Sequence, residues 1–257
     1  MLRNPTLSEN TKWRQNSVTV SGGNGRGNRS DHLYCPAGAI IDNEKDSLII
    51  CDYVNDRAVR WSPQNGESGE TIISNIRCWG LTMDDERNLY IVDFRAHDVR
   101  RYRMGENQGT VVAGGNGQGN RLDQLNNPRH IFVDRDQSVY VSDCSNHRVM
   151  KWMKGAKQGI VAAGVQDRGN RLGQLSNPRE LFVDQSGSAY LVDQYNHRIM
   201  RWSQGAQQRS IIIGGNGQGS QSNQLYSPID LTFDREGNIY VFDNENHRVQ
   251  KFNIDRH

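Results

Sequence analysis

Three side chains that can bind a metal ion or move a proton stand at matched positions in the second half of the chain. His130, Glu180 and Asp230 are spaced by 50 residues, and each lies two residues after a proline. Imidazole and carboxylate groups are ligands for divalent cations and common general acids and bases. If they converge near the mouth of a central channel, we expect a divalent-cation or polar-ligand site there. The alternative is that each side chain only hydrogen-bonds the neighbouring backbone.

Aspartate and arginine also recur five residues apart. The recurring pairs are Asp52 with Arg57, Asp143 with Arg148, Asp193 with Arg198 and Asp243 with Arg248. An aspartate that ends one strand can pair with an arginine that opens the next and so fix the turn between them. Because the pair is repeated, we predict structural staples rather than a catalytic site.

A third group of residues consists of arginines that follow glycine-rich segments or strand-opening prolines. They are Arg29, Arg121, Arg129, Arg171 and Arg179. In an antiparallel meander the linkers that carry several of them emerge on the same side as the Asn-His-Arg turns. Since loops on a rigid scaffold commonly carry function, we predict a binding face on this side.

The elements that must position these residues are repeated along the chain. YVSDCSNHRVMKW (140–152) recurs at 190–202 and 240–252, and looser copies end at Trp61 and Tyr102. Each copy contains short runs rich in β-branched and aromatic residues between turn-forming residues, and no run keeps a helical period. This repeated pattern predicts an all-β fold, namely a β-propeller of five four-stranded blades, or of six blades if one is missing from the count.

The ends of the chain suggest how the ring closes. The last copy stops after its third strand, at Phe252, and residues 17–21 resemble the fourth strand that it lacks. We therefore expect the N-terminal strand to complete the last blade and remove an open edge. Residues 1–11 are expected to be a flexible segment, and residues 12–257 a single propeller domain.

Composition excludes several classes of protein. With 31 Lys and Arg against 29 Asp and Glu, the net charge is +2, which argues against a dedicated nucleic-acid coat or polybasic membrane binder. No run reaches the ~18 apolar residues of a membrane span. The first residues have no apolar signal-peptide core, which favours the cytoplasm. The four scattered cysteines are expected to be buried thiols in a reducing compartment.

The repeated pattern resembles a known family. P-x5-D followed by YVxD-x2-NHR is similar to the NHL repeat, from about residue 12 to residue 252. The linkers of the GGNGQGN type resemble those of expanded NHL arrays in some invertebrates. The resemblance implies a propeller, usually of six blades, that binds a partner through its loop-rich face. We expect a monomeric, non-catalytic scaffold for a protein or peptide.

Two other functions remain open. RNA binding through a basic face would be similar to that of the NHL modules of TRIM-type ubiquitin ligases. A metal-dependent hydrolase or lyase centred on His130, Glu180 and Asp230 would resemble lactonase-type and amidating-lyase propellers. No Ser-His-Asp or Cys-His grouping points to other catalysis, and no cofactor is expected beyond a divalent cation in the channel.

Overall fold

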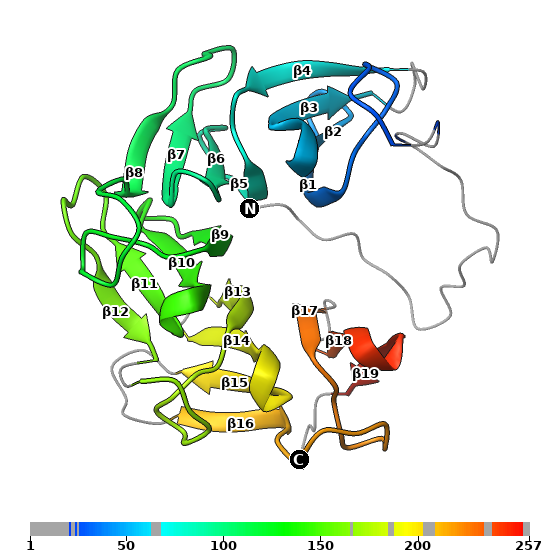
Figure 1. The fold of residues 1–257 in the computed structure, drawn as a ribbon, viewed down its shortest axis with the longest axis vertical. Helices are drawn as coiled ribbons and strands as arrows, with labels where there is room; N and C mark the ends of the chain where they lie inside the picture. Colours follow the sequence, from blue (N-terminus) through cyan, green and yellow to red (C-terminus); the bar gives the residue numbers. More distant parts are fainter. Residues whose placement is uncertain are drawn as a thin grey trace. The chain divides into compact units, whose positions relative to one another are not determined.

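A computed structural model describes residues 21, 24, 26–62, 68–164, 167–184, 188–202, 209–233 and 238–253 of the chain. In these residues the secondary structure is strand, with single turns of 3-10 helix between strands (Figure 1). None of the described helices is long and apolar enough to cross a membrane. The fold class is the predicted one, an all-β propeller of five blades.

Each sheet is formed by strands that follow one another in the sequence. The first is β1 (Pro36–Asp42), β2 (Ser47–Asp52), β3 (Arg57–Trp61) and β4 (Gly69–Ser74). The second is β5 (Cys78–Met83), β6 (Leu89–Asp93), β7 (Asp98–Tyr102) and β8 (Thr110–Gly114). The third is β9 (Pro128–Val133), β10 (Val139–Asp143), β11 (Arg148–Trp152) and β12 (Ile160–Ala163). The fourth is β13 (Pro178–Val183), β14 (Ala189–Asp193), β15 (Arg198–Trp202) and β16 (Arg209–Gly214). The fifth is β17 (Pro228–Phe233), β18 (Ile239–Asp243) and β19 (Arg248–Phe252).

The fourth strand of a blade carries a β-bulge at a repeated place. One residue is left out of the register with the third strand in each of the four-stranded sheets, and these residues are Ile72, Val112, Ala162 and Ile212. A bulge bends an edge strand and locally increases its twist. The repeated bulge therefore bends the outer strand of each of these four blades at the same place.

A glycine ends β8 and β16 and directly follows β12, for a steric reason. Gly164 has φ +76°, and a Cβ there would collide with the carbonyl oxygen of His147 in the turn of the same blade. Gly114 and Gly214 stand in the same position relative to His97 and His197. Only glycine combines this left-handed conformation with so close an approach of two backbones.

The third strands end in large buried side chains. Trp61 and Trp152 are 1% exposed, and Tyr102 and Trp202 are also buried. The aliphatic side chains of the second strands, such as Ile91 and Val141, are inaccessible to solvent. Strands buried on both faces read as continuous apolar runs, which explains why IIC, LYIV and YLV show no polar alternation.

The chain divides into two compact units. One contains residues 12–139 and 152–158, and the other contains residues 1–11, 140–151 and 159–257. In the first unit β5 contacts both β1 and β9, and in the second β13 contacts β17, so the first strands of consecutive blades lie next to each other within a unit. The predicted closing strand at residues 17–21 and the predicted flexible segment at residues 1–11 lie outside the described residues, apart from Ser21.

One disulfide corrects the prediction of four buried thiols. Cys51, near the end of β2, is bonded to Cys78, the first residue of β5, with a Cα–Cα distance of 5.1 Å. Cys35 is exposed, and Cys144 is a buried thiol. The 27-residue separation hides the pair in the sequence, because it joins two different blades. Disulfides persist mainly in oxidising compartments, so this pair is an observation against the cytoplasmic expectation.

Candidate functional site

The ends of the sheets where the second strand turns into the third are called the turn edge. The turns are single 3-10 turns: η1 (Tyr53–Asn55), η3 (Cys144–Asn146), η4 (Gln194–Asn196) and η5 (Asn244–Asn246). The residue after each turn, Asp56 or a histidine, has φ between 51° and 55°. This left-handed residue reverses the chain so that it can enter the third strand.

The predicted Asp and Arg pairs lie in contact across these turns. The Arg Nε to Asp Oδ2 distance is 2.7 Å for Asp52 with Arg57, Asp143 with Arg148 and Asp193 with Arg198, and 2.8 Å for Asp243 with Arg248. All four aspartates are inaccessible to solvent. Asp193 also accepts hydrogen bonds from the Ser176 backbone N–H at 2.7 Å and from Asn196 Nδ2 at 2.8 Å.

The arginine of the pair also holds the glycine-rich linker. Arg198 donates from Nη1 to the Asn170 carbonyl at 2.7 Å, and from Nη2 to the carbonyls of Arg171 and Gln174 at 3.1 and 3.0 Å. One side chain thus satisfies a carboxylate and three carbonyls in a fixed fork, which suits a guanidinium and not an ammonium group. That these pairs stabilise the turns stays a prediction, which measurements of the free energy of unfolding can test.

The turn histidines form a second repeated contact. His147 Nδ1 accepts a hydrogen bond from the Asn177 backbone N–H at 3.1 Å, and His197 Nδ1 accepts one from the Ser227 N–H at 3.0 Å. Desolvation lowers the pKa of both imidazoles, and nearby Arg168 lowers that of His147 further. A neutral imidazole with an acceptor at Nδ1 therefore ties each turn to the start of the next blade.

The first blade lacks the histidine contact, and the second lacks the aspartate–arginine pair, although His97 Nδ1 still accepts a hydrogen bond from the Asn127 backbone N–H at 3.3 Å. Asp56 replaces the histidine and receives hydrogen bonds from Arg77 Nε at 2.8 Å and from Arg95 Nη2 at 2.6 Å. Burial acts to raise the pKa of Asp56, but the two arginines outweigh it and hold the pKa below its usual value. In the second blade Asp98 replaces the arginine, lies opposite Asp93, and is held by Arg100 at 3.1 Å.

An aromatic cluster lies at the turn edge of the first unit. Trp79, the second residue of β5, has its ring centroid 4.8 Å from that of Tyr53 and 5.5 Å from that of Phe94. The Arg129 guanidinium carbon lies 3.9 Å from the Trp79 ring centroid and 5.5 Å from that of Phe94. All four side chains are half-buried. Together, Tyr53, Trp79, Phe94 and Arg129 are called the aromatic cluster.

Sequence reasoning selected Arg129 but missed the three rings. Trp79 occupies the position that alanine, arginine or isoleucine holds in the other blades, namely Ala37, Arg129, Arg179 and Ile229. Phe94 directly follows the aspartate that ends β6, as Tyr53 follows Asp52. The sequence therefore did contain a sign of the cluster, because aligned repeats differ at these positions. The two positions are the second residue of the first strand and the residue that follows the second strand.

The predicted binding arginines are in different environments. Arg29, whose side chain is 76% exposed, lies 3.3 Å from Asp31, and Arg121, 65% exposed, lies 2.8 Å from Asp123. Arg129 stacks on Trp79, and Arg179 Nε donates to Gln194 Oε1 at 2.6 Å. Arg171 is exposed, and its backbone N–H donates to Gln174 Oε1 at 3.2 Å. Two of the five are thus paired with an acid of their own loop.

The predicted channel residues are all half-buried first-strand residues. His130 lies on β9 in the first unit, and Glu180 and Asp230 lie on β13 and β17 in the second. In the part of the chain that the structure describes, no three His, Cys, Asp or Glu side chains form a group able to hold a metal ion. The equivalent Gly80 has no room for a side chain, because a Cβ would collide with the Arg129 carbonyl. The channel site stays a prediction.

Comparison with known families places the last repeat. Residues 225–252 match the family model described as NHL repeat. The fifth blade thus resembles an NHL repeat. The match contains β17, β18 and β19 with the Asp243 and Arg248 pair, and the copies at 140–152 and 190–202 repeat the same Asn-His-Arg turn. The predicted resemblance to the NHL repeat is thereby confirmed for residues 225–252.

Several solved structures share the fold of this chain. An auxiliary nutrient binding protein from Bacteroides thetaiotaomicron VPI-5482 is 19% identical with a TM-score of 0.69, covering 86% of this chain and 59% of its own. A chain of a nidogen/laminin complex is 20% identical with a TM-score of 0.66, covering 85% and 75%. The gluconolactonase XC5397 from Xanthomonas campestris is 16% identical with a TM-score of 0.60, covering 88% and 78%.

At these identities the likeness shows the fold alone. The chain spans about three-fifths of the nutrient binding protein that it matches. No curated protein sequence is similar enough to count as a relative.

Proposed function

We propose that this NHL-repeat propeller is a scaffold that binds a protein or peptide through the turn edge, with the aromatic cluster at the centre of the contact. The observation that carries the proposal is the set of three half-buried rings from two blades with an arginine stacked on them. Tryptophan, tyrosine and arginine dominate the binding energy of protein interfaces, where they fill partly desolvated positions. Core packing does not require them, since the other blades fill these positions with smaller or polar residues.

Charged residues next to the cluster supply the polar rim that such an interface needs. Arg77 and Arg95 both bind the carboxylate of Asp56, and the Arg77 guanidinium carbon lies 5.4 Å from the Tyr53 ring centroid. This network fixes the side chains around the rings before a partner arrives. Groups that are ordered in advance lose less conformational entropy on binding.

The charge of the turn edge favours a protein over RNA. Nucleic-acid binding draws most of its affinity from lysines and arginines that neutralise phosphates. Arg29 and Arg121 each already face a carboxylate two residues away, so the field that a phosphate would meet is weakened. The nutrient binding protein and the chain of the nidogen/laminin complex lend this chain only the general precedent of a similar fold in proteins that bind partners.

A displayed peptide library tests the proposal. Wild-type protein is immobilised and used to select binders, and the Kd of the best peptide is then measured for wild type, Trp79→Ala and Phe94→Ala by fluorescence anisotropy. Truncating a hot-spot ring is expected to weaken binding at least ~30-fold, equivalent to ~2 kcal/mol. Phe182→Ala is the matched control, because Phe182 lies 5.0 Å from the ring of Phe233 in another aromatic group near the opposite end of a first strand.

Equal Kd values for wild type and both cluster variants refute the location. A labelled uridine oligonucleotide measured in parallel separates the alternative function. If it binds more tightly than any selected peptide, with an affinity that falls steeply between 50 and 200 mM salt, the propeller is an RNA-binding module instead.

A further inference from the structure

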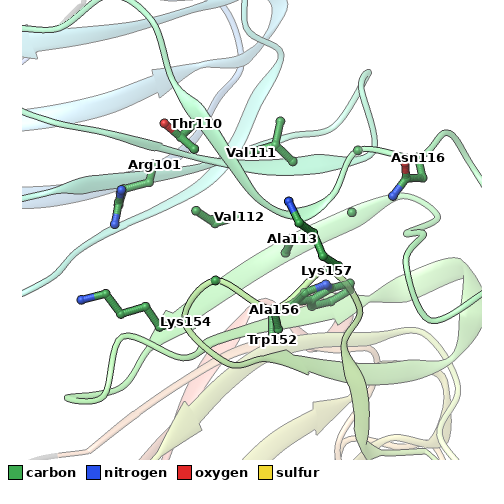
Figure 2. A pocket seen from close by; sticks show the side chains of 13 residues that line it. Arg101, Thr110, Val111, Val112, Ala113, Asn116, Trp152, Lys154, Ala156 and Lys157 are labelled. Atoms are coloured by element: carbon green, nitrogen blue, oxygen red, sulfur yellow. The ribbon is translucent and has the colours of Figure 1, made fainter.

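A groove in the first unit runs along the outer strand of the second blade. Its volume is about 590 Å³, and it lies between β8 on one side and residues 154–157 on the other (Figure 2). The buried side chains of Ala113 and Trp152 contribute to its lining. The volume is within the usual range of ligand-binding clefts.

The β8 side of the groove is the edge of a sheet. β8 pairs with β7 and is the last strand in the order of its sheet, so its outer edge has no strand partner among the described residues. Thr110 and Val111 are exposed, Val111 at 45%. The backbone groups of such an edge can pair with an added strand, and the alternate side chains of that strand then meet the pockets beside it.

The lining of the groove carries positive charge. Arg101, Lys154 and Lys157 line it, and no aspartate or glutamate is among its lining residues. Within the described part of the chain none of these three cations forms an ion pair. Figure 2 shows Arg101 and Lys154 on the same side of the pocket and Asn116 on the other.

The two lysines are not required by the fold. The segment after Trp152 reads Met-Lys-Gly-Ala-Lys, and the corresponding segment after Trp202 reads Ser-Gln-Gly-Ala-Gln. Gln204 and Gln207 thus stand where Lys154 and Lys157 stand one repeat earlier. A basic residue at the position of Arg101, by contrast, recurs as Lys151 and Arg201 and belongs to the blade pattern. Comparison of the repeats therefore shows that the positive charges of Lys154 and Lys157 are particular to this groove and are not part of the blade pattern.

We propose that this groove binds an extended acidic peptide of about five residues as an additional strand on β8. The five residues of β8 (Thr110–Gly114) set the length of the added strand. Backbone hydrogen bonds to β8 hold the peptide, and its carboxylates on alternate residues face Lys154, Lys157 and Arg101. The site is distinct from the aromatic cluster and does not depend on it.

The test uses an acetylated, amidated six-residue peptide of alternating glutamate and valine, titrated into the full chain. Binding is followed by isothermal calorimetry and by the amide resonances of residues 110–114. We expect saturable binding with shifts in those resonances. The double variant Lys154→Gln/Lys157→Gln installs the residues of the next repeat, so it is expected to fold normally, and its Kd is expected to rise roughly tenfold from the loss of two exposed ion pairs.

Two further peptides separate strand addition from simple charge attraction. An analogue N-methylated at alternate residues keeps every carboxylate but loses the backbone donors, and it is expected to lose binding. A peptide of alternating lysine and valine is expected not to bind. The proposal is overturned if the acidic peptide does not bind at 1 mM, if the N-methylated analogue binds equally well, if the double variant binds unchanged, or if a uridine oligonucleotide competes more tightly than the peptide. Trp79→Ala is expected to bind the acidic peptide as wild type does, so this outcome is independent of the proposed function.

Discussion

Replacing Arg198 and Arg248 separately by alanine tests whether the turn pairs hold the blades together. The two arginines make the same set of contacts, a carboxylate at 2.7 or 2.8 Å and three linker carbonyls between 2.7 and 3.1 Å. They differ in burial, since the Arg198 side chain is 4% exposed and that of Arg248 is 30% exposed. The pair of variants therefore compares one set of interactions at two levels of burial. Gln250 Nε2 gives the Arg248 site two additional hydrogen bonds, to Asp243 Oδ2 at 3.2 Å and to the Gln224 carbonyl at 3.1 Å.

Burial decides the expected magnitude. Removing Arg198 leaves a solvent-inaccessible aspartate without its counter-ion, a loss that is ~3–5 kcal/mol for a buried pair. Around Arg248 water can hydrate the carbonyls that are released, so the expected loss falls to ~1–2 kcal/mol. Arg198→Lys is expected to lie between them, because a lysine restores the charge but not the fork that reaches three carbonyls.

Urea denaturation followed by tryptophan fluorescence and by far-ultraviolet circular dichroism measures these losses. Coincidence of the two transitions and an unchanged m-value are the controls, because an array of repeats can lose two-state behaviour. Equal losses for Arg198→Ala and Arg248→Ala, or a loss below ~1 kcal/mol for Arg198→Ala, refute the view that these buried pairs are staples.

Three other perturbations follow from the structure. Burial raises the pKa of Asp98 against the opposing effect of Arg100, so the wild type loses stability as pH rises through the folded-state pKa. Thermal melts are therefore expected to show that Asp98→Asn gains stability relative to wild type between pH 4 and pH 7. Desolvation lowers the pKa of His197, so wild-type stability is lost as pH falls from above 6.5 through the folded-state pKa. The variant His197→Asn keeps a residue that tolerates positive φ, and its melting temperature is expected to fall less than that of the wild type over the same pH range. Cys51→Ser/Cys78→Ser is expected to lower the free energy of unfolding by ~3–4 kcal/mol, the chain-entropy value for the 27-residue separation, and to abolish the response to reductant; a wild-type melting temperature that reductant leaves unchanged contradicts the disulfide.

The regular part of the fold could be predicted because it is repeated. The second strands end at Asp52, Asp93, Asp143, Asp193 and Asp243, and the third strands end at Trp61, Tyr102, Trp152, Trp202 and Phe252, as the spacing predicted. In a single copy, short runs such as VYVSD are ambiguous between a buried strand and other apolar elements. Five copies in register remove that ambiguity, because the same boundary signals recur with the same period.

Contacts that join two different copies could not be predicted in this way. The bond between Cys51 and Cys78 and the stacking of Arg129 on Trp79 each join neighbouring blades at positions where the other copies carry different residues. An argument from periodicity uses the residues that all copies have in common. It therefore predicts contacts that every blade makes and misses contacts that only one pair of blades makes. The expectation of buried thiols was wrong for Cys51 and Cys78 for this reason, while Cys144 is the buried thiol that was expected.

The departures from the repeat therefore carry the functional information. In the later blades the residue after the turn is a histidine, and His147 and His197 each accept a backbone N–H from the start of the next blade. In the first blade Asp56 gathers Arg77 and Arg95 in that place, beside the stacked rings of Tyr53 and Trp79. A ring of blades needs the common contacts for packing, so selection for stability alone favours uniform copies. Some side chains of the first two blades do not form the common contact. They stay half-exposed and contact one another across adjacent blades. Binding of a partner explains this arrangement better than packing does. The same reasoning sets Lys154 and Lys157 apart from the glutamines of the next repeat, and it locates both proposed surfaces in the first unit.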